Sequence, residues 1–496
     1  MTVPFNNIPS NVRPPLFYAE MDNSMANIFN LNQKTLLVGQ KLTAGVGVAD
    51  TPIICSSEAD AMNLCGRGSM LARMYTFARA QDPLGEIWLL PVVEPGAGVA
   101  ATGTITLTGT ATASGTLFTT IAGQLVQSAV TSGDTPTVAA AALTAAINAN
   151  TDLPVTASAA AGVVTLTSRW KGETGNDITV LSNYRGAAGG ERTPAGVTVA
   201  IVAMAIGVGA PTLTNAIGAM GDEEFDFIAL PFTDTTSLDA FKVAMSDTNG
   251  RWAYNRQVYG HVYGGKRGNL SALTTFGGAR NDQHATIAGV ETGVPTPIWE
   301  YASAYTSRNA VFLKVDPARP TQTGVLSGVL PAPASGRFTL TERQSLLSYG
   351  IATSFVGGGA VLIERAITTY QKNAFNQADT SYLDSETLHT SAYVIRYLRS
   401  IVTSKYARHK LADDGTVFGA GAAIVTPAII KGELIAAYRQ LEFDGIVENA
   451  DAFKAALIVE RPANDPNRLN VLLAPDYVNQ LRVFAALVQF RLQSAA

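Results

Sequence analysis

Four histidines are the side chains of this chain best suited to metal binding or acid–base chemistry. They stand at His261, His284, His389 and His409, and none has a second histidine or a cysteine at the spacing of a metal site. His389 and His409 are expected at opposite ends of one helix, too far apart to share an ion. Both are interpreted as surface or helix-capping residues, and the sequence predicts no metal site.

The two cysteines, Cys55 and Cys65, are ten positions apart. Cys55 is expected just before a helix and Cys65 within it. Both are interpreted as small buried residues of a protein made in a reducing compartment, where disulfides are rare. We therefore expect synthesis in a cytoplasm, without a disulfide framework.

Loops that cradle phosphate groups are the next candidates for chemistry, and the Gly-x-x-x-x-Gly-Lys-Ser/Thr pattern does not occur. The segment Gly45–Asp50 is the nearest approach to a dinucleotide fingerprint, but it lacks the third glycine and leads into Thr-Pro rather than a helix. It is interpreted as a turn. The run Gly357–Gly359 precedes a predicted strand, so no helix N-terminus is available there for an anion. No cofactor is predicted.

A serine hydrolase would place its nucleophile on a sharp turn, with a histidine and an acid nearby. The Gly-x-Ser-x-Gly pattern is absent. The segment Gly66-Arg67-Gly68-Ser69-Met70 faintly resembles the surroundings of a subtilase nucleophile, but it precedes every histidine, and no His-Gly pair is present to supply the base. No catalytic residue is predicted, and a structural role is favoured over an enzyme.

The composition points to a protein with many covered surfaces. Of 496 residues, 47% are hydrophobic and only 15% are charged, against roughly 25% charged in an average soluble domain. The length allows two to four domains. A net charge of −4 without a basic run does not favour nucleic acid. Apolar stretches are interrupted well before ~18 residues, so membrane insertion is not expected. Met1–Ser10 has no secretory-signal pattern, so no export is expected.

The first third of the chain shows two kinds of pattern. Thr35–Gly39 and Glu86–Val93 are predicted strands on either side of a helix at Ser57–Ala80, a β-α-β unit typical of a parallel or mixed sheet. From Pro95 to Ser168 the only charged residues are Asp134 and Asp152. Alternating strands at Gly103–Gly109 and Gly162–Ser168 and a helix at Thr137–Asn150 predict a small inserted β-rich domain rather than a low-complexity segment.

The α/β pattern resumes near Val197, and a last domain begins near Asn376. Predicted strands are Gly221–Pro231, Gln257–Tyr263, Ala310–Val315 and Val361–Thr368, and predicted helices are Ser237–Asn249 and Thr341–Phe355. In the last domain a long helix opens at Asp384 or Ser385 and ends before Asp413. It is followed by a helix at Pro427–Gln440, by Ala450–Ala456, and by strands at Leu457–Glu460 and Leu469–Leu473 and at the terminus.

The predicted fold is an α/β core, a mixed sheet with helices, with an inserted small β-rich domain, an α+β C-terminal domain, and extended arms at both ends. The predicted boundaries are 1–30 for the N-terminal arm, 31–96 and 197–375 for the core, 97–196 for the outer insert, 376–480 for the C-terminal domain and 481–496 for the C-terminal arm.

Both ends of the chain have the character of unpaired β-strands, which on a monomer would promote aggregation. Completing a sheet in a neighbouring subunit would remove that hazard, while pairing within the chain's own sheets stays an open alternative. The residues predicted to exchange between subunits are Val12, Leu16, Phe17 and Tyr18 at one end, and Val483, Phe484, Leu487, Val488, Phe490 and Leu492 at the other.

Several segments, in this order and spacing, resemble the sheath protein of a contractile phage tail of the Mu-like type. The resemblance runs over essentially the whole chain, although no single motif is diagnostic. It is carried by the N-terminal arm Ile8–Glu20 with Met21-Asp22-Asn23-Ser24, by Gly133-Asp134-Thr135, Gly162–Thr167 and Gly175-Asn176-Asp177-Ile178 in and after the insert, and by Tyr382-Leu383-Asp384 and Pro466–Val471 near the end.

The resemblance implies a subunit of hexameric rings, stacked helically around a rigid tail tube. The terminal strands would join a sheet in the C-terminal domains of neighbours and act as tethers. Contraction, triggered at the baseplate, would drive the tube through the host cell envelope during genome ejection. The implied partners are copies of the chain itself, the tail tube protein, and the baseplate and tail terminator proteins. The implied locations are the virion and, during assembly, the host cytoplasm. The family's core domain has been called subtilisin-like, but the missing motifs imply no proteolysis.

A basic patch, made of Lys405, Arg408 and Lys410, is a candidate for facing the tube; cations placed at a helix C-terminus are the alternative interpretation. Two other functions stay open from the sequence. A phage-derived contractile injection particle of the tailocin type would obey the same physics. A β-rich surface adhesin fits the Thr/Ala-rich insert but would need an export signal.

Overall fold

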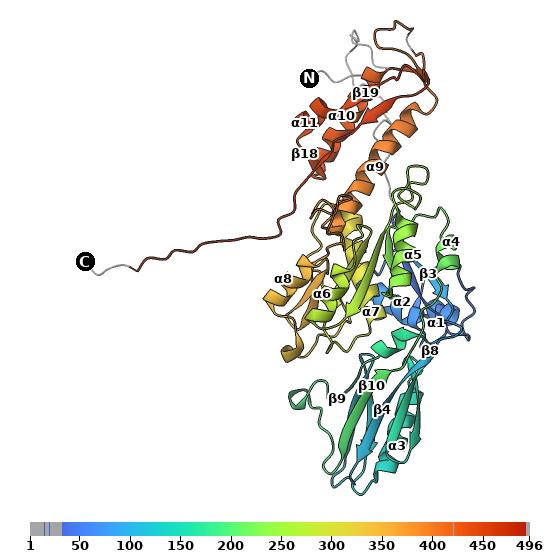
Figure 1. The fold of residues 1–496 in the computed structure, drawn as a ribbon, viewed down its shortest axis with the longest axis vertical. Helices are drawn as coiled ribbons and strands as arrows, with labels where there is room; N and C mark the ends of the chain where they lie inside the picture. The colour runs from blue at the N-terminus through green and yellow to red at the C-terminus, as the bar shows by residue number, and fades with distance from the viewer. Residues whose placement is uncertain (1–13, 15–18, 20–31, 420, 493–496) are drawn as a thin grey trace.

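The computed structural model describes residues 14, 19, 32–419 and 421–492. The predicted N-terminal exchange residues Val12, Leu16, Phe17 and Tyr18 lie outside the described residues. The described part is elongated: a β-rich region at one end, an α/β body in the middle and a smaller helical unit at the other end, from which the C-terminal segment runs away from the molecule (Figure 1).

The α/β body is built on a six-stranded sheet of order β13-β12-β11-β1-β3-β2. Five strands run parallel, and β2 is antiparallel to β3 at the edge, so the mixed α/β prediction is confirmed. The bounds are β1 Thr35–Gln40, β2 Ile53–Cys55, β3 Ile87–Val92, β11 Phe227–Ala229, β12 His261–Arg267 and β13 Ala285–Val290. The three-residue β2 was not predicted, because a strand that short has no readable periodicity.

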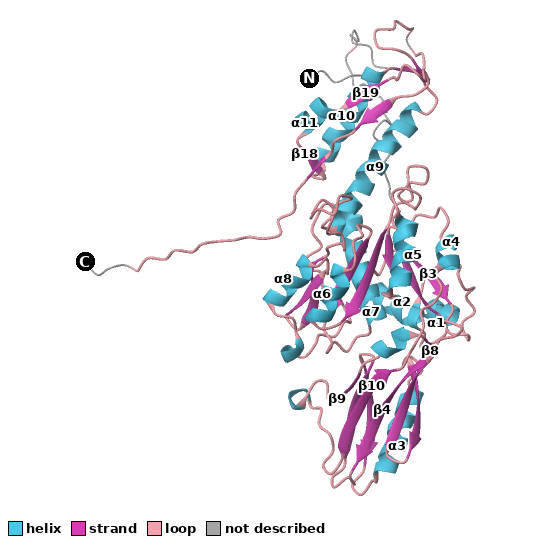
Figure 2. Ribbon diagram, viewed as in Figure 1, coloured by secondary structure: helices cyan, strands magenta, loops and turns pink. Residues whose placement is uncertain are grey.

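Helices cover this sheet on both faces (Figure 2). Their bounds are α1 Glu58–Cys65, α2 Met70–Gln81, α4 Thr214–Ala219, α5 Thr235–Met245, α6 Leu270–Gly278, α7 Ile298–Val315 and α8 Leu340–Ser348. The single helix predicted at Ser57–Ala80 was wrong. It divides into α1 and α2 because Gly66 and Gly68 adopt left-handed φ angles of 87° and 77°, and a Cβ on Gly68 would lie 2.6 Å from the Thr151 carbonyl oxygen.

Three further predictions in the body need correction. Ala310–Val315 is the end of helix α7 and not a strand. The run is apolar at every position but Lys314 although only Ala310 and Leu313 are buried and Val315 is 82% exposed, so it has no polar face to reveal the helical period. The strand predicted at Gln257–Tyr263 begins only at His261. The helix predicted at Thr341–Phe355 ends at Ser348 and gives way to an antiparallel pair, β14 Thr353–Gly357 with β15 Ala360–Arg365.

The inserted region packs a four-stranded sheet, β10-β4-β8-β7, against a three-stranded sheet, β6-β5-β9, and helix α3. The bounds are β4 Ala100–Thr108, β5 Gly115–Ile121, β6 Gln124–Val130, α3 Pro136–Ala149, β7 Val155–Ala160, β8 Val163–Lys171, β9 Val180–Ser182 and β10 Thr198–Ala205, with the short helix η1 at Glu173–Asp177. The predicted alternation is confirmed, since buried residues alternate with half-buried ones along β4 and β8. The Thr135 hydroxyl caps α3.

The unit at the other end is smaller and joined to the body by one long helix, α9 Ser385–Tyr406 (Figure 1). Its predicted start is confirmed. The unit adds α10 Pro427–Phe443, α11 Ala450–Ala456 and three two-stranded pairs: β16 Lys410–Leu411 with β17 Ile424–Val425, β18 Val447–Glu448 with β21 Asp476–Tyr477, and β19 Ile458–Glu460 with β20 Asn470–Leu472. Its core includes Tyr438 stacked on Phe453, with ring centroids 3.8 Å apart.

Candidate inter-subunit surface

The histidines form no catalytic or metal-binding arrangement. His389 is buried in α9, where its Nε2 lies 3.0 Å from the Tyr263 hydroxyl and its ring stacks on Phe227. Burial lowers its pKa to about 3, so the ring is neutral and the predicted surface or capping role was wrong. His409 is exposed and lies beyond the end of α9. Across the described ranges, no group of three His, Cys, Asp or Glu side chains could hold a metal ion.

The remaining candidates for nucleophiles have structural roles. Ser69 accepts a hydrogen bond from the Ala72 N–H at 3.1 Å and caps α2, so its hydroxyl belongs to a helix start. Cys55 and Cys65 are buried and unbonded to each other. Burial raises the pKa of the Cys55 thiol to about 11 and that of Cys65 to about 12, which makes both thiols poor nucleophiles at neutral pH.

The inserted region packs onto the edge of the sheet where a parallel sheet of this order usually holds a ligand. The crevice at the carboxyl ends of the strands lies where the strand order reverses, beside β1. Gln40, at the end of β1, donates to the Lys171 carbonyl at 2.9 Å and accepts from the Thr174 hydroxyl at 3.2 Å. Trp170 packs edge-on against Trp299, with ring centroids 5.3 Å apart. The insert therefore covers the carboxyl end of β1, and a cavity of about 290 Å³ remains beside it, between the insert and the ends of β11 and β12.

The C-terminal arm, residues 483–492, is apolar and lies outside the folded body (Figure 1). Its residues form no strand and make no hydrogen bond to the rest of the described chain. The six predicted exchange residues are exposed, Val483 by 78%, Phe484 by 83%, Leu487 by 87%, Val488 by 82%, Phe490 by 81% and Leu492 by 85%. An apolar segment of this length exposed to water marks an interaction site or an aggregation hazard.

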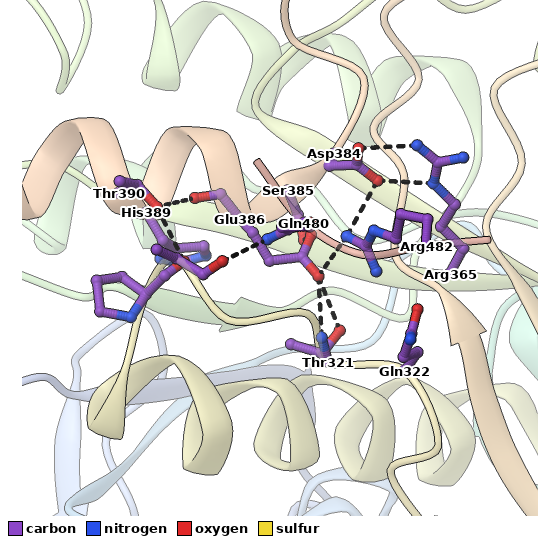
Figure 3. Close-up of polar contacts among 12 residues, drawn as sticks. Thr321, Gln322, Arg365, Asp384, Ser385, Glu386, His389, Thr390, Gln480 and Arg482 are labelled. Atoms are coloured by element: carbon purple, nitrogen blue, oxygen red, sulfur yellow. Dashed lines mark hydrogen bonds and ion pairs between the residues drawn. The ribbon is translucent and has the colours of Figure 1, made fainter. Parts of the chain in front are cut away.

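The root of this arm is bound to the chain's own body. Arg482 reaches Asp384 and Glu386 at the start of α9, with Nη2–oxygen distances of 3.2 and 2.9 Å (Figure 3). Gln480 donates to the Ala318 carbonyl at 2.8 Å. Sequence reasoning did not single out these contacts, because their partners lie 96 to 162 positions away along the chain.

An apolar groove of about 350 Å³ runs between the helices of the C-terminal unit and β20. It is lined by Ile395, Leu398 and Val402 of α9, Ile430 and Leu434 of α10, and Leu469, Val471 and Leu473 around β20. Next to it the β19–β20 pair has two strands only, so both of its outer edges lack a strand partner within the described residues. Unpaired backbone groups beside an apolar groove are what an added strand requires.

The basic patch is not arranged as predicted. Lys405 lies in the last turn of α9, but the helix ends at Tyr406, so Arg408 and Lys410 are not on it. Lys410 belongs to β16. The Lys405 ammonium pairs with Glu433 of α10 at 2.5 Å. Arg408 and Lys410 are exposed and form no ion pair within the described residues.

In the described part of the chain, no helix has both the length and the apolar character needed to cross a bilayer.

Comparison with known proteins gives one consistent result. Three family models match: the phage tail sheath protein beta-sandwich domain over residues 96–198, the phage tail sheath protein central domain over 207–369, and the phage tail sheath C-terminal domain over 377–491. A Mu-like prophage FluMu tail sheath protein from Haemophilus influenzae is 43% identical over 493 residues, which are 99% of this chain and 100% of the relative.

Among solved structures, two sheath tail proteins are similar over most of their length. The one from Desulfitobacterium hafniense is 14% identical, with a TM-score of 0.47 over 94% of this chain and 99% of that one. The one from Listeria innocua is 11% identical, with a TM-score of 0.48 over 91% of this chain and 93% of that one.

Proposed function

Because the chain belongs to the phage tail sheath family, we propose that it polymerises as stacked hexameric rings around a tail tube. It is a structural protein of the phage tail and not an enzyme. In this proposal the extended polymer is metastable. Its contraction, triggered at the baseplate, drives the tube through the host cell envelope during genome ejection. Assembly takes place in the host cytoplasm, and the other partners are the tube and tail terminator proteins.

The observation that carries this proposal is the exposed apolar arm, together with the groove beside β20. Six apolar side chains of the arm are almost fully solvated in the isolated chain. Burying each would contribute about 1.5–3 kcal/mol, and each added backbone hydrogen bond about 0.5–1.5 kcal/mol. We infer that the arm of one subunit adds to the outer edge of the β19–β20 pair of a neighbour and fills the groove. The N-terminal residues Val12, Leu16, Phe17 and Tyr18 are proposed to extend the same sheet.

The proposed division of labour follows the predicted boundaries. Segments 31–96 and 197–375 form the subtilisin-like core, 97–196 the outer insert and 376–480 the C-terminal sheath domain, between arms at 1–30 and 481–496. The family-model matches at 96–198, 207–369 and 377–491 support this division. The basic patch is retained as a candidate contact to the tube. The position of Lys405 in the last turn of α9 and its pair with Glu433 favour the alternative of a cation placed at a helix C-terminus.

Negative-stain microscopy of the purified protein tests the proposal. Without a tube to template the extended form, we expect long hollow striated cylinders in the contracted arrangement. Sedimentation that shows only a stable monomer at micromolar concentration, in several salts, would contradict the proposal.

A further inference from the structure

We propose that an arm clasp, made of Arg482, Gln480, Gln322, Asp384 and Glu386, fixes where the C-terminal arm leaves the subunit and so sets the register of the polymer. Arg482 is then a positioning residue: it holds the arm in place and does not enter the neighbour. The inference rests on the proposed exchange of arms between subunits. It holds that the root of the arm stays bound to its own subunit, and that only the residues after Arg482 reach the neighbour.

The ionic centre of the clasp is buried. Arg482 keeps 11% of its side chain exposed and Glu386 none. The Arg482 Nη2 lies 2.9 Å from Glu386 Oε1 and 3.2 Å from Asp384 Oδ1 (Figure 3). A buried carboxylate is tolerated only when it is paired and hydrogen-bonded. Arg482 is therefore required to stay in this position for the start of α9 to remain stable.

The two carboxylates are also held by other groups of the subunit. Arg365 on β15 binds Asp384 through two hydrogen bonds, of 2.8 and 2.9 Å. The Thr321 N–H and hydroxyl both donate to Glu386, at 3.1 and 3.2 Å. Two-point contacts of this kind fix direction as well as distance. These contacts fix both carboxylates in place. If the arm moved, the Arg482 guanidinium would therefore lose its hydrogen bonds to them.

The residues beside Arg482 repeat the attachment. Gln480 donates to the Ala318 carbonyl at 2.8 Å, and Gln322 donates to the Leu481 carbonyl at 3.3 Å. Three consecutive residues of the root are therefore held, whereas Val483, the next residue, is 78% exposed. The change from fixed to free takes place over one residue, which makes Val483 the first mobile position of the arm.

The clasp removes slack that the covalent chain would otherwise allow. Before the clasp, the Val478 N–H donates to the Ile446 carbonyl at 3.3 Å. The four residues 479–482 follow, and if they were free their extended length would let the start of the arm wander by up to roughly 14 Å. Strand pairing between subunits repeats every two residues, or roughly 6.6 Å. If the start of the arm were displaced by up to roughly 14 Å, the arm could pair with the neighbour's strand two or more residues out of register. The clasp prevents this displacement.

A charged clasp suits positioning better than it suits stability. Replacing a buried ion pair by uncharged groups of similar size is often neutral, whereas removing one partner is strongly destabilising. Arg482 Nε and Nη1 are moreover buried without a partner in the described structure, so the pair is not optimised for stability. This asymmetry provides the test, because a double substitution can remove the direction of the contact without leaving a charge unpaired.

The test compares Arg482→Gln, the double variant Arg482→Gln/Glu386→Gln, and the control Arg73→Gln/Glu300→Gln. The control removes another buried pair, at 2.8 Å between α2 and α7, far from the arm. Arg482→Gln alone should lower the melting temperature of the unassembled subunit. In Arg482→Gln/Glu386→Gln, the clasp double variant, most of this fall in melting temperature should be reversed. Its polymers should nevertheless lose a regular repeat in microscopy. Its critical concentration should rise, by roughly 1.7-fold if the free segment lengthens from ten residues, 483–492, to fourteen, 479–492. The control should keep the parental repeat.

A clasp double variant with the parental repeat and critical concentration overturns the proposal, and so does a control with the same defect. Spin labels give a second measurement that does not need polymers or a stable double variant. Cysteines introduced by Asn479→Cys and Ala485→Cys can be labelled selectively, because Cys55 and Cys65 are buried. In the monomer the label at 479 should be immobile and the label at 485 mobile; equal mobility refutes the clasp. Failure of the parent to polymerise would refute the proposed function and leave the spin-label result to decide the clasp.

Discussion

Acidification should destabilise the subunit through His389, the ring that lies between α9 and the central sheet. The ring is buried, stacks on Phe227 with centroids 4.7 Å apart, and lies within 3.0 Å of the Tyr263 hydroxyl. Burial, with a smaller contribution from Arg396, lowers its pKa to about 3. The native state therefore keeps this histidine neutral at pH values where an unfolded chain has protonated it.

The size of the effect follows from the difference between the two pKa values. An unfolded histidine titrates near pH 6.5. Below that pH the unfolded state binds more protons than the native state, so stability falls as pH falls, by up to about 1.4 kcal/mol per pH unit. Above pH 6.5 the effect vanishes, and it saturates below the native pKa near 3. At pH 5 the loss from His389 amounts to about 2 kcal/mol, of which about 1 kcal/mol arises between pH 6 and 5. His261, whose pKa burial also lowers, adds a loss of the same sign.

Urea denaturation of the unassembled subunit, followed by tryptophan fluorescence at constant ionic strength, measures this slope. His389→Gln should lower the stability at pH 7 but reduce the loss between pH 6 and 5 by about 1 kcal/mol. The matched control His409→Gln removes an exposed histidine and should leave the slope unchanged. A parental stability that is flat between pH 6 and 5, or a His389→Gln slope equal to that of the parent, would refute the assignment.

Three further predictions concern assembly. Truncation after Arg482 should abolish polymerisation and change subunit stability by less than about 0.5 kcal/mol, because residues 483–492 are exposed. Removal of Thr2–Glu20 should abolish polymerisation without unfolding the subunit. A sharp fall in melting temperature in either truncation would instead support pairing within the chain. Replacing Gly98–Thr193 by a short linker should uncover Trp299 and lower the melting temperature but still give tubes; loss of assembly in a folded product would contradict an outer, dispensable insert. Reversing the charges of Lys405, Arg408 and Lys410 tests the contact to the tube. Extended tails that stay intact would favour cations at a helix C-terminus, with Lys405 paired to Glu433. Tails that no longer hold the tube would favour a tube contact.

Sequence patterns predicted the elements whose burial is one-sided. The strands β4 and β8 and the capped helix α3 were found because one face of each is buried and the other is half-exposed, which imprints a period on the sequence. Helix α7 was missed at Ala310–Val315 because apolar residues occupy its exposed positions as well as its buried ones, Val315 being 82% exposed. The break between α1 and α2 depends on two left-handed glycines, and glycine alone does not tell a helix break from a helix interior.

The candidate inter-subunit surface was likewise predictable from the sequence only in part. The apolar arm could be recognised because it is one continuous segment with no polar face. The groove that is proposed to receive it could not, because α9, α10 and β20 each contribute only part of the lining. The arm clasp was missed for a related reason: Arg482 meets Asp384 across 98 positions of sequence, and local patterns carry no information about such a pairing.

The arm clasp also determines how tension would pass through the subunit. The arm emerges beside β21, which is held to β18 by a two-residue pair, a weak point for any pulling force. A pull on the arm reaches Arg482 first, and from there it enters the base of α9 and, through Arg365, strand β15. The load path therefore bypasses the small C-terminal unit and ends in the stiff central body.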